Sequence, residues 1–298
     1  MRFPITLNDS QIQKIIDSYS SSSLPLTNNY TLFRAKINTT TLTIFKTKTI
    51  MLQGTTEKLV ANEIFKLLNI DQEIKIENKP EEIKILKNLI GTDEVGTGDF
   101  FGSIFVVAAY VTVDNIDLLT KLGVKDSKEL TDNYILELAP ELMKMIDYEV
   151  IKLDNLHYNY LVTKQNYNMN SIKANMHNSV INSIKKKVKN YEGIIIDAFT
   201  TSSNYFNYLK NVDNVAKDVT LIEKAENKYV SVACASIIAR YLFLKDIERL
   251  SNEVGFDLPK GAGKPVDAVI MMMYKNNIQN LLTKIAKINF NNLKKVLK

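Results

Sequence analysis

Residues 88–113 read NLIGTDEVGTGDFFGSIFVVAAYVTV, an apolar stretch that contains two adjacent acids followed by glycines. The apolar residues predict two strands, at about 90–95 and 104–109. Asp93 and Glu94 interrupt the first of them, and a buried carboxylate costs several kcal/mol unless it is paired or bound to a cation. The segment Gly96-Thr97-Gly98 leaves the main chain open to an extended ligand. Together these features predict a metal-dependent phosphate site.

The two acids raise a geometric question. Neighbouring residues on a regular strand face opposite ways, so Asp93 and Glu94 can reach one site only if the backbone bends. The glycines that follow predict such a bend at the end of the strand.

Two acids further along the chain are candidates for the same site. Asp197 ends the apolar run 193–196, which is typical of a strand buried on both faces, and α/β proteins commonly place ligand groups at that end of a strand. A simple turn explains Asp197 about equally well. Glu226 precedes a long helix predicted from about Lys228 to Leu250, where compensation of the helix dipole is the alternative explanation.

Composition narrows the class of protein. With 298 residues and 45% apolar content, the chain can form one large domain and a smaller companion. The single cysteine, Cys234, excludes an internal disulfide and is expected in the core, and only two histidines accompany it, so a Cys/His zinc site is excluded. No apolar run approaches the ~18 residues of a membrane span, and we expect a soluble cytoplasmic protein.

The first 70 residues carry a concentrated positive charge, with eight Lys or Arg against four acids. Their apolar pattern predicts a helix, several antiparallel strands and a second helix. Four cations are predicted to group on the strands: Arg34, Lys36, Lys46 and Lys48. Contact with a polyanion and an ordinary solvated sheet face explain them equally well. The charged stretch 71–84 predicts a linker, and residues 85–298 a second domain.

The second domain is expected to alternate strands and helices. Asp126 to Glu129 has capping-box spacing and predicts a helix start, with Pro140 interrupting or restarting that helix. Further strands are predicted at 148–153 and 220–222, a helix at 171–189, and packed helices at the C-terminus. The cluster of lysines near residue 187 is typical of a solvated helix end.

The order of the motifs resembles that of the type 2 ribonucleases H, and within them ribonuclease HIII. The glycine-rich motif at 91–102 is close to the family signature, and later matches follow in the expected order: Lys125-Asp126-Ser127-Lys128, His177-Asn178, Ile196-Asp197-Ala198, Lys224-Ala225-Glu226, Ile237-Ile238-Ala239-Arg240 and Leu258-Pro259-Lys260-Gly261. The segment up to Gly54 is similar to the TATA-binding-protein-like domain of ribonuclease HIII.

This resemblance implies an α/β fold, a ribonuclease H-like mixed sheet flanked by helices and preceded by a small α+β domain. It implies an endonuclease that cuts the RNA strand of RNA/DNA hybrids and leaves 5′-phosphate and 3′-hydroxyl ends, with a role in DNA replication and repair. The catalytic and metal-binding residues would be Asp93, Glu94, Asp197 and Glu226, and two Mg²⁺ or Mn²⁺ ions would bind there, with Asp93 as the bridging ligand. Gly96, Thr97, Gly98 and Lys128 would contact the substrate, as would the N-terminal cations. No obligatory protein partner is expected, and the chain is expected to be a monomer.

Three alternatives stay open at this stage. One is a ribonuclease HII-like activity at single embedded ribonucleotides, although Gly96-Thr97-Gly98 differs from the Gly-Arg/Lys-Gly of that enzyme and favours runs of RNA. A second is a non-catalytic hybrid-binding protein, which would gain nothing from clustering acids beside a phosphate backbone. The third is another two-metal nuclease or phosphotransferase.

Overall fold

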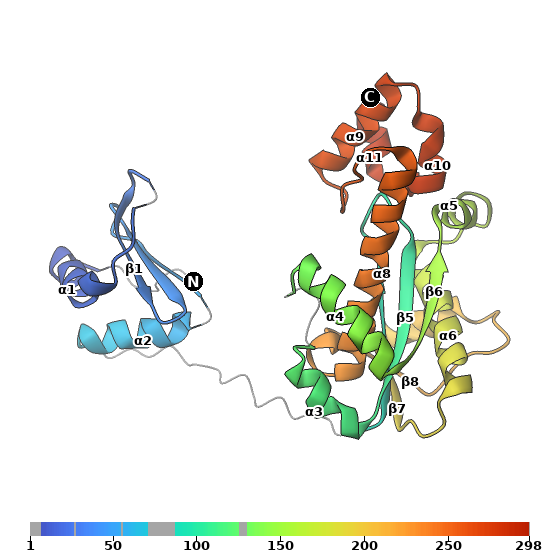
Figure 1. The fold of residues 1–298 in the computed structure, drawn as a ribbon, viewed down its shortest axis with the longest axis horizontal. Coiled ribbons are helices and arrows are strands. Elements are labelled where there is room, and N and C mark those ends of the chain that lie inside the picture. Colours follow the sequence, from blue (N-terminus) through green and yellow to red (C-terminus); the bar gives the residue numbers. More distant parts are fainter. Residues whose placement is uncertain (1–6, 27, 55, 71–86, 125–129, 298) are drawn as a thin grey trace. The chain divides into compact units, whose positions relative to one another are not determined.

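The structure is a computed structural model that describes residues 7–26, 28–54, 56–70, 87–124 and 130–297. It divides into two compact units, Met1–Glu82 and Ile83–Lys298 (Figure 1). The expected linker at 71–84, the expected helix start at 126–129 and the candidate substrate residue Lys128 lie outside the described residues. Within those residues, no helix combines the length and apolar character needed to cross a membrane.

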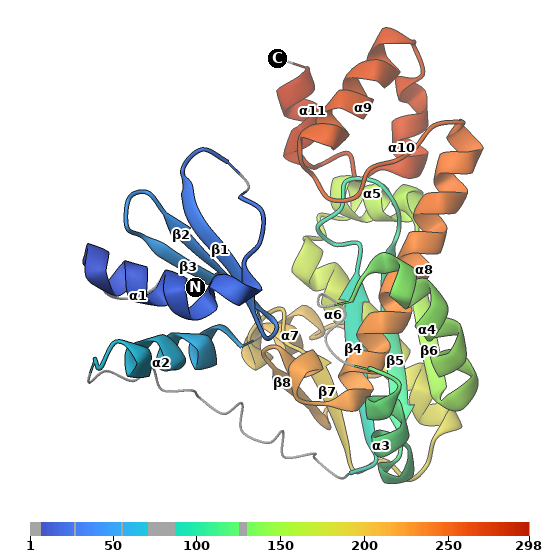
Figure 2. The same cartoon turned by 60° about the vertical axis from the view of Figure 1, so that its left-hand side comes forward.

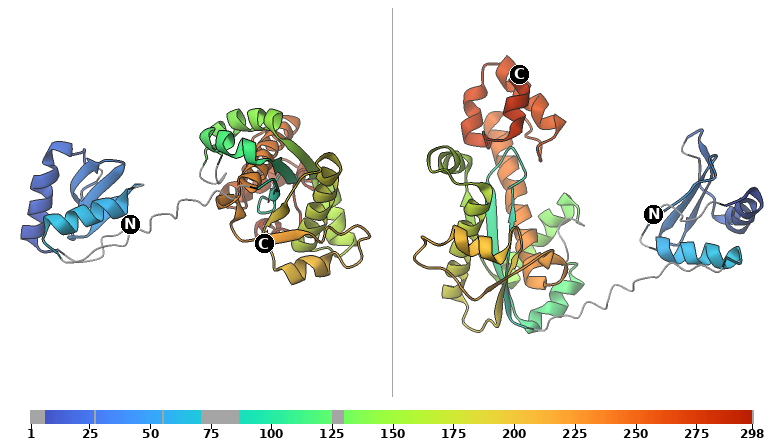
Figure 3. Two further views of the ribbon diagram at one scale, coloured as in Figure 1. Left: turned by 90° about the horizontal axis from the view of Figure 1, so that it is seen from below. Right: turned by 180° about the vertical axis from the view of Figure 1, so that it is seen from behind.

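The N-terminal unit is a three-stranded antiparallel sheet with helices on one face (Figure 3). Its elements are α1 (Asp9–Tyr19), the short 3-10 helix η1 (Ser20–Ser22), β1 (Thr31–Ile37), β2 (Thr40–Phe45), β3 (Ile50–Gln53) and α2 (Glu57–Leu67). Asn8 caps α1, accepting from the Gln11 amide, as residues of this type commonly do. Alternate strand residues such as Ala35 and Leu42 pack against Ile15 and Ile64 of the helices, which fixes which face of the sheet is buried.

The larger unit is built on a mixed five-stranded sheet of order β6-β5-β4-β7-β8. The strands are β4 (Leu89–Val95), β5 (Ile104–Val111), β6 (Asp147–Leu153), β7 (Gly193–Asp197) and β8 (Val219–Ile222). β4 is central, pairing antiparallel with β5 and parallel with β7. The parallel pairing brings the ends of β4 and β7 to the same edge of the sheet, and their acids with them.

Helices cover both faces of this sheet (Figure 2). One face packs on α3 (Val113–Lys121), α4 (Asp132–Met145) and α8 (Val230–Val254), and the other on α5 (Asn155–Lys164), α6 (Met169–Lys187) and α7 (Ser202–Tyr208). β5 is apolar throughout because its successive residues serve the two cores in turn, Val107 facing α8 and Val106 facing α6. Cys234 lies in the first core, as predicted.

The C-terminal part joins the core on the α8 side. It consists of α9 (Lys264–Lys275), the 3-10 helix η4 (Gln279–Leu281), α10 (Leu282–Ile285) and α11 (Asn291–Val296), and another short 3-10 helix, η3 (Ala225–Asn227), precedes α8. Ile270, Met273 and Ile285 are buried against that core.

One local prediction was wrong, and one helix was not predicted. Pro140 neither interrupts nor restarts a helix, because α4 runs unbroken from Asp132 to Met145 with Pro140 inside it, and the Thr131 side chain caps its start by accepting from the Tyr134 amide. α3 was not predicted; it begins directly after β5, and its buried residues are only Ile116 and Leu119.

Candidate active site

The site begins with a close approach of β4 to α8. A Cβ on Gly91 would lie 2.3 Å from the backbone nitrogen of Val232, so only glycine allows this packing. The small residues of α8, among them Ala233, Ala235 and Ser236, are buried along the same contact. This packing brings Ser236 within hydrogen-bonding reach of the Asp93 carboxyl.

Asp93 is the most buried acid at the end of β4, with 8% of its surface exposed. Its Oδ1 accepts a hydrogen bond from the Glu94 amide at 2.7 Å. Burial raises the pKa of Asp93 well above its ordinary value, and the charges of Glu94 and Asp197 raise it further. The carboxyl therefore lies in a strongly negative environment.

Glu94 points to the opposite face of the sheet, toward α6. Its carboxylate forms an ion pair with Lys173 and a hydrogen bond with His177 Nε2 at 2.9 Å, and His177 Nδ1 lies 2.8 Å from Thr92 Oγ1. Burial alone would raise the pKa of Glu94, but the hydrogen bond with His177 and the Lys173 ammonium together lower it. Glu94 is therefore held ionised.

Between Asp93 and Glu94 the strand stays regular, and the bend predicted at the end of the strand occurs at Gly96. The pairing of β4 with β5 runs in register from Leu89 to Val95, and the first residue with a left-handed backbone is Gly96, at φ 94°. The two acids therefore point to opposite faces of the sheet at the end of the strand, Glu94 toward α6 and Asp93 toward α8. The chain turns after them rather than between them.

Phe199 completes the surroundings of Glu94. Its ring stacks on His177 with 5.3 Å between centroids, and the Lys173 Nζ lies 4.2 Å from its centroid. Sequence reasoning missed Lys173, and it noted His177 only as a motif match. Their signal is a lysine and a histidine four residues apart on a helix face whose other members are Ile172, Met176 and Val180.

Asp197 and Glu226 form the other half of the site. Asp197 Oδ1 accepts a hydrogen bond from the Ala225 amide at 2.9 Å, which holds the turn before α8 against the end of β7. Burial and the neighbouring Glu226 raise the pKa of Asp197 to about 6, against a hydrogen bond from Ala225 that lowers it. Glu226 is 4% exposed. The chain thus keeps two carboxyl groups in direct contact, an arrangement that a cation would stabilise.

The four predicted acids are therefore linked by electrostatic interactions, Asp93 with Glu94 and Asp197, and Asp197 with Glu226 and Glu94. As the side chains stand, no three acidic, histidine or cysteine residues within the described parts of the chain are grouped closely enough to hold a metal ion. The chemistry of the donor set nevertheless fits a hard divalent cation, because all four groups offer oxygen. A cation would also offset the burial and the neighbouring negative charges that raise the pKa values of Asp93 and Asp197.

The glycine-rich loop follows directly on β4. A Cβ on Gly96 would lie 2.3 Å from the Ser103 carbonyl oxygen, whereas Gly98 is exposed and a Cβ there would meet nothing within 4 Å. Thr97 is half-buried between them. The loop thus folds back tightly at its base and presents an open backbone at its tip, which can admit a ligand close to the main chain.

The N-terminal cations separate into two groups. Arg34 and Lys36 lie on β1 and face away from the helices, whereas Lys46 and Lys48 lie in the turn after β2 rather than on a strand. Lys48 pairs with Asp9 at the start of α1 at 2.9 Å. Lys46 lines a shallow hollow with Leu26, Asn28, Asn29, Thr31 and Leu32. The sequence predicted all four cations on strands, and this is wrong for Lys46 and Lys48, which lie in the turn between β2 and β3.

Comparison with known proteins gives two family matches. The profile of the family described as Ribonuclease HII matches residues 90–293, and that of a Domain of unknown function (DUF3378) matches residues 3–73. Among curated relatives, the ribonuclease HIII of Streptococcus agalactiae is 41% identical over 290 residues, covering 96% of this chain and 95% of that protein. The ribonuclease HIII of Phytoplasma mali is 47% identical over 230 residues, covering 74% of this chain and 80% of that protein.

Solved structures agree with these matches. Bst-RNase HIII in complex with Mn²⁺ superposes with a TM-score of 0.70 at 33% identity, covering 100% of this chain and 98% of that one. RNase H3 of Aquifex aeolicus, at 24% identity and a TM-score of 0.57, covers 98% of this chain and 100% of its own and supports the fold.

Proposed function

The chain belongs to the ribonuclease HIII family, a ribonuclease H type of enzyme that acts on RNA/DNA hybrids, and from this premise we propose how its own residues do so. We infer that it hydrolyses internal phosphodiester bonds of the RNA strand with two divalent ions, leaving 5′-phosphate and 3′-hydroxyl ends. The observation that carries this proposal is the group of four acids, linked by electrostatic interactions, at the ends of β4 and β7 and before α8.

Asp93, Glu94, Asp197 and Glu226 would hold the ions. When bound, Mg²⁺ or Mn²⁺ would activate the attacking water and relieve the charge on the leaving oxygen. Asp93 is the candidate for the shared ligand, because it is buried at the end of the central strand with Glu94 next to it and Asp197 near it. Lys173 and His177 would keep Glu94 ionised and oriented, which is the usual role of groups that bond to a metal ligand.

The glycine-rich loop would read the substrate. The open backbone at Gly98, with the amide of Gly96 and the hydroxyl of Thr97, suits close hydrogen bonding to 2′-hydroxyl groups in the shallow minor groove of a hybrid. Lys128 would add a phosphate contact. We propose that the enzyme acts on runs of RNA rather than on single embedded ribonucleotides.

The N-terminal unit would add sequence-independent contacts to phosphates through Arg34, Lys36, Lys46 and Lys48. We further propose a cytoplasmic monomer that needs no protein partner and acts in DNA replication and repair. Measuring the mass of the purified chain by light scattering tests the monomer; a stable dimer would contradict it.

The proposed activity is tested with four labelled duplexes: an RNA/DNA hybrid, a DNA/DNA duplex, and DNA duplexes that contain either one or several consecutive ribonucleotides. Each is incubated with Mg²⁺, with Mn²⁺ and with EDTA. We expect internal cleavage of the hybrid and of the longer ribonucleotide run, dependent on the metal and yielding 5′-phosphate ends. Cleavage in EDTA, or equal cleavage of the DNA/DNA duplex, would refute the proposal, and preferential cleavage at the single ribonucleotide would favour the ribonuclease HII-like activity.

A further inference from the structure

Lys287 is a fully buried lysine outside the cluster of acids. Its surface exposure is 0%, and burial lowers its pKa to about 7, although the charges of Asp99 and Asp246 partly oppose that shift. Its Nζ donates hydrogen bonds to the carbonyl oxygens of Asp99 at 2.8 Å and Gly102 at 2.6 Å. Burial of an amine at this position is costly, and both of these acceptors belong to the glycine-rich loop.

The backbone around Lys287 binds the same loop. The Lys287 amide donates to the Phe100 carbonyl at 2.8 Å, and the Gly102 amide donates to the Ile285 carbonyl at 3.0 Å. Phe101 and Ala286 form an isolated antiparallel bridge between these bonds. Residues 285–287 therefore run beside residues 99–102 as a short added strand, with the lysine side chain reinforcing it.

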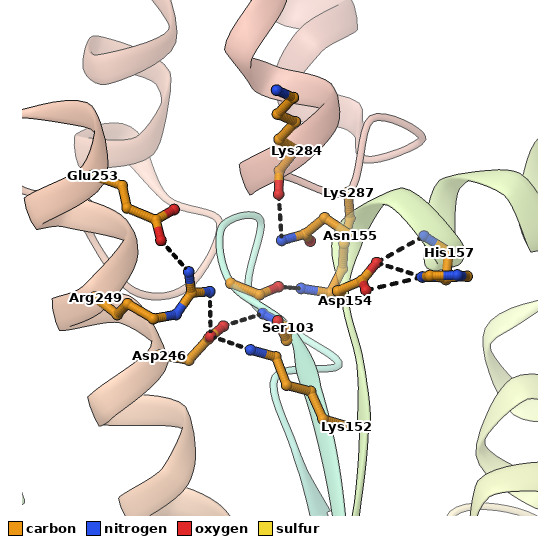
Figure 4. Close-up of polar contacts among 11 residues, drawn as sticks. Ser103, Lys152, Asp154, Asn155, His157, Asp246, Arg249, Glu253, Lys284 and Lys287 are labelled. Atoms are coloured by element: carbon orange, nitrogen blue, oxygen red, sulfur yellow. Dashed lines mark hydrogen bonds and ion pairs between the residues drawn. The ribbon is translucent and has the colours of Figure 1, made fainter.

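Other elements fix this added strand in place. On α5, Asn159 Nδ2 donates to the carbonyls of Thr283 at 3.1 Å and Ala286 at 2.9 Å, and its Oδ1 accepts from the Ile288 amide at 3.1 Å. Nearby, Asp246 accepts from the Ser103 amide and from Lys152, which anchors the far end of the loop (Figure 4). The loop is thus held directly by residues 285–287 and by Asp246, and Asn159 in turn holds the added strand.

Two further hydrogen bonds lie nearer the tip of the loop. The Phe100 amide donates to the Gly261 carbonyl at 2.8 Å, and the Gly261 amide donates to Asp99 Oδ1 at 2.5 Å. The part of the loop that is held by hydrogen bonds therefore extends to Asp99. Gly98, the next residue toward the tip, has an open backbone. The direction in which the Gly98 backbone faces therefore depends on residues 99–102, which follow it and are held by these hydrogen bonds.

We propose that Lys287 is a positioning residue: by binding the carbonyls of Asp99 and Gly102, it orients the Gly96-Thr97-Gly98 backbone for binding to the hybrid. This inference rests on the proposed role of that loop in recognising the substrate. Since Lys287 touches none of the four acids, its removal should weaken binding of the hybrid more than it slows the chemical step.

The substitution Lys287→Met tests this, because methionine fills much of the buried space and cannot donate a hydrogen bond. Lys284→Met is the matched control: the same change three residues earlier, at an exposed side chain (Figure 4). On a hybrid substrate we expect Lys287→Met to raise KM about tenfold, as the loss of one or two buried hydrogen bonds implies, and to change kcat less than about threefold. Lys284→Met should leave both constants unchanged.

Two further measurements separate positioning from general damage. Hydrogen exchange should become faster at the amides of residues 97–102 in Lys287→Met and stay unchanged in α6 and β7, and the affinity for Mn²⁺ measured by calorimetry should match wild type. Should Lys287→Met not fold, Lys287→Gln retains one amide donor and should give an intermediate KM with faster exchange in the loop.

An unchanged KM with wild-type exchange in the loop would overturn the inference, as would a fall in kcat with KM unchanged. Failure of the wild-type protein to cleave any hybrid would instead refute the proposed function. The exchange measurement needs no substrate and would still report whether Lys287 orders the loop.

Discussion

The fold raises the pKa of Asp197 into a range of pH in which the stability of the protein can be measured. Burial and Glu226 raise its pKa to about 6, from an ordinary value of 3.8. A carboxyl group that binds its proton more tightly in the folded state favours folding at low pH, and this contribution is lost as pH rises from about 4 to about 6. Above that range the ionised group destabilises the fold in the absence of a cation.

Asp197→Asn should therefore stabilise the protein at pH 7.5 in EDTA. After allowance for the partial exposure of this side chain, we expect a gain of about 1 kcal/mol, or about 2–4 °C in Tm. Mg²⁺ should raise the Tm of wild type and have a smaller effect on the variant. Thermal unfolding followed by circular dichroism checks both, and a lower Tm for the variant in EDTA would contradict the argument.

Asp93→Asn should abolish cleavage without loss of the fold. The amide keeps the shape of the side chain and removes a negative charge from a site where burial and two neighbouring acids already oppose ionisation. We expect hydrolysis of the hybrid to fall by more than about 10³-fold, because each of the proposed ions would supply several kcal/mol of stabilisation to the transition state. Binding of the hybrid, measured by fluorescence anisotropy, should persist. Turnover at the wild-type rate would exclude Asp93 from the mechanism.

At this scale the sequence could predict the acids but not their partners. Acids inside an apolar strand stand out because their burial is costly, and so Asp93, Glu94 and Asp197 were identifiable. Lys173 and His177 lie 79 and 83 residues beyond Glu94 along the chain and contact it only through packing of α6 on the sheet. Periodicity places them on a helix, and it does not show which strand residue they will meet.

At the scale of elements, the contact of β4 with α8 sets the position of Asp93. Gly91→Ala would place a methyl group 2.3 Å from the Val232 backbone nitrogen, so one element must shift. We expect a loss of about 1–3 kcal/mol in the free energy of unfolding and a marked fall in cleavage. Urea unfolding measures the first and a hybrid assay the second.

Gly98→Ala is the control for this change. Its added methyl group meets nothing within 4 Å and its backbone angle does not require glycine, so the stability should match wild type. Equal stability of the two alanine variants would contradict this argument, because it would show that β4 and α8 can accommodate the added methyl group at residue 91 without cost.

The elements themselves were largely predictable, and their ends were not. β6, β7, α6 and α8 occur close to the predicted ranges because their apolar patterns are long and clear. Pro140 was misread because a helix tolerates proline when neighbouring contacts hold it, and α4 packs in the main core on both sides of that residue. The bend predicted at the end of β4 occurs at Gly96, since pairing with β5 keeps the strand regular through Val95.

At the scale of the whole molecule, the sequence shows that positive charge is concentrated in the N-terminal unit. The structure shows where its cations lie. The face of the N-terminal sheet away from its helices carries Arg34 and Lys36, opposite Thr43 and Thr41 on β2. No acid stands between Tyr30 and Gly54. Lys48 is partly compensated by Asp9 and is expected to contribute less to binding of a polyanion.

The double substitution Arg34→Gln, Lys36→Gln tests this division in the full chain, with Lys48→Gln as control. If both cations on the sheet contact phosphates, their loss should weaken hybrid binding uniformly across sequences and reduce the slope of log Kd against log salt by about 1–2. The position of cleavage should not change, since it depends on the four acids. Anisotropy titrations from 50 to 200 mM salt, a range over which such contacts change affinity strongly, give the slopes. A steeper loss for Lys48→Gln than for the double variant would place the binding surface at the β2–β3 turn instead.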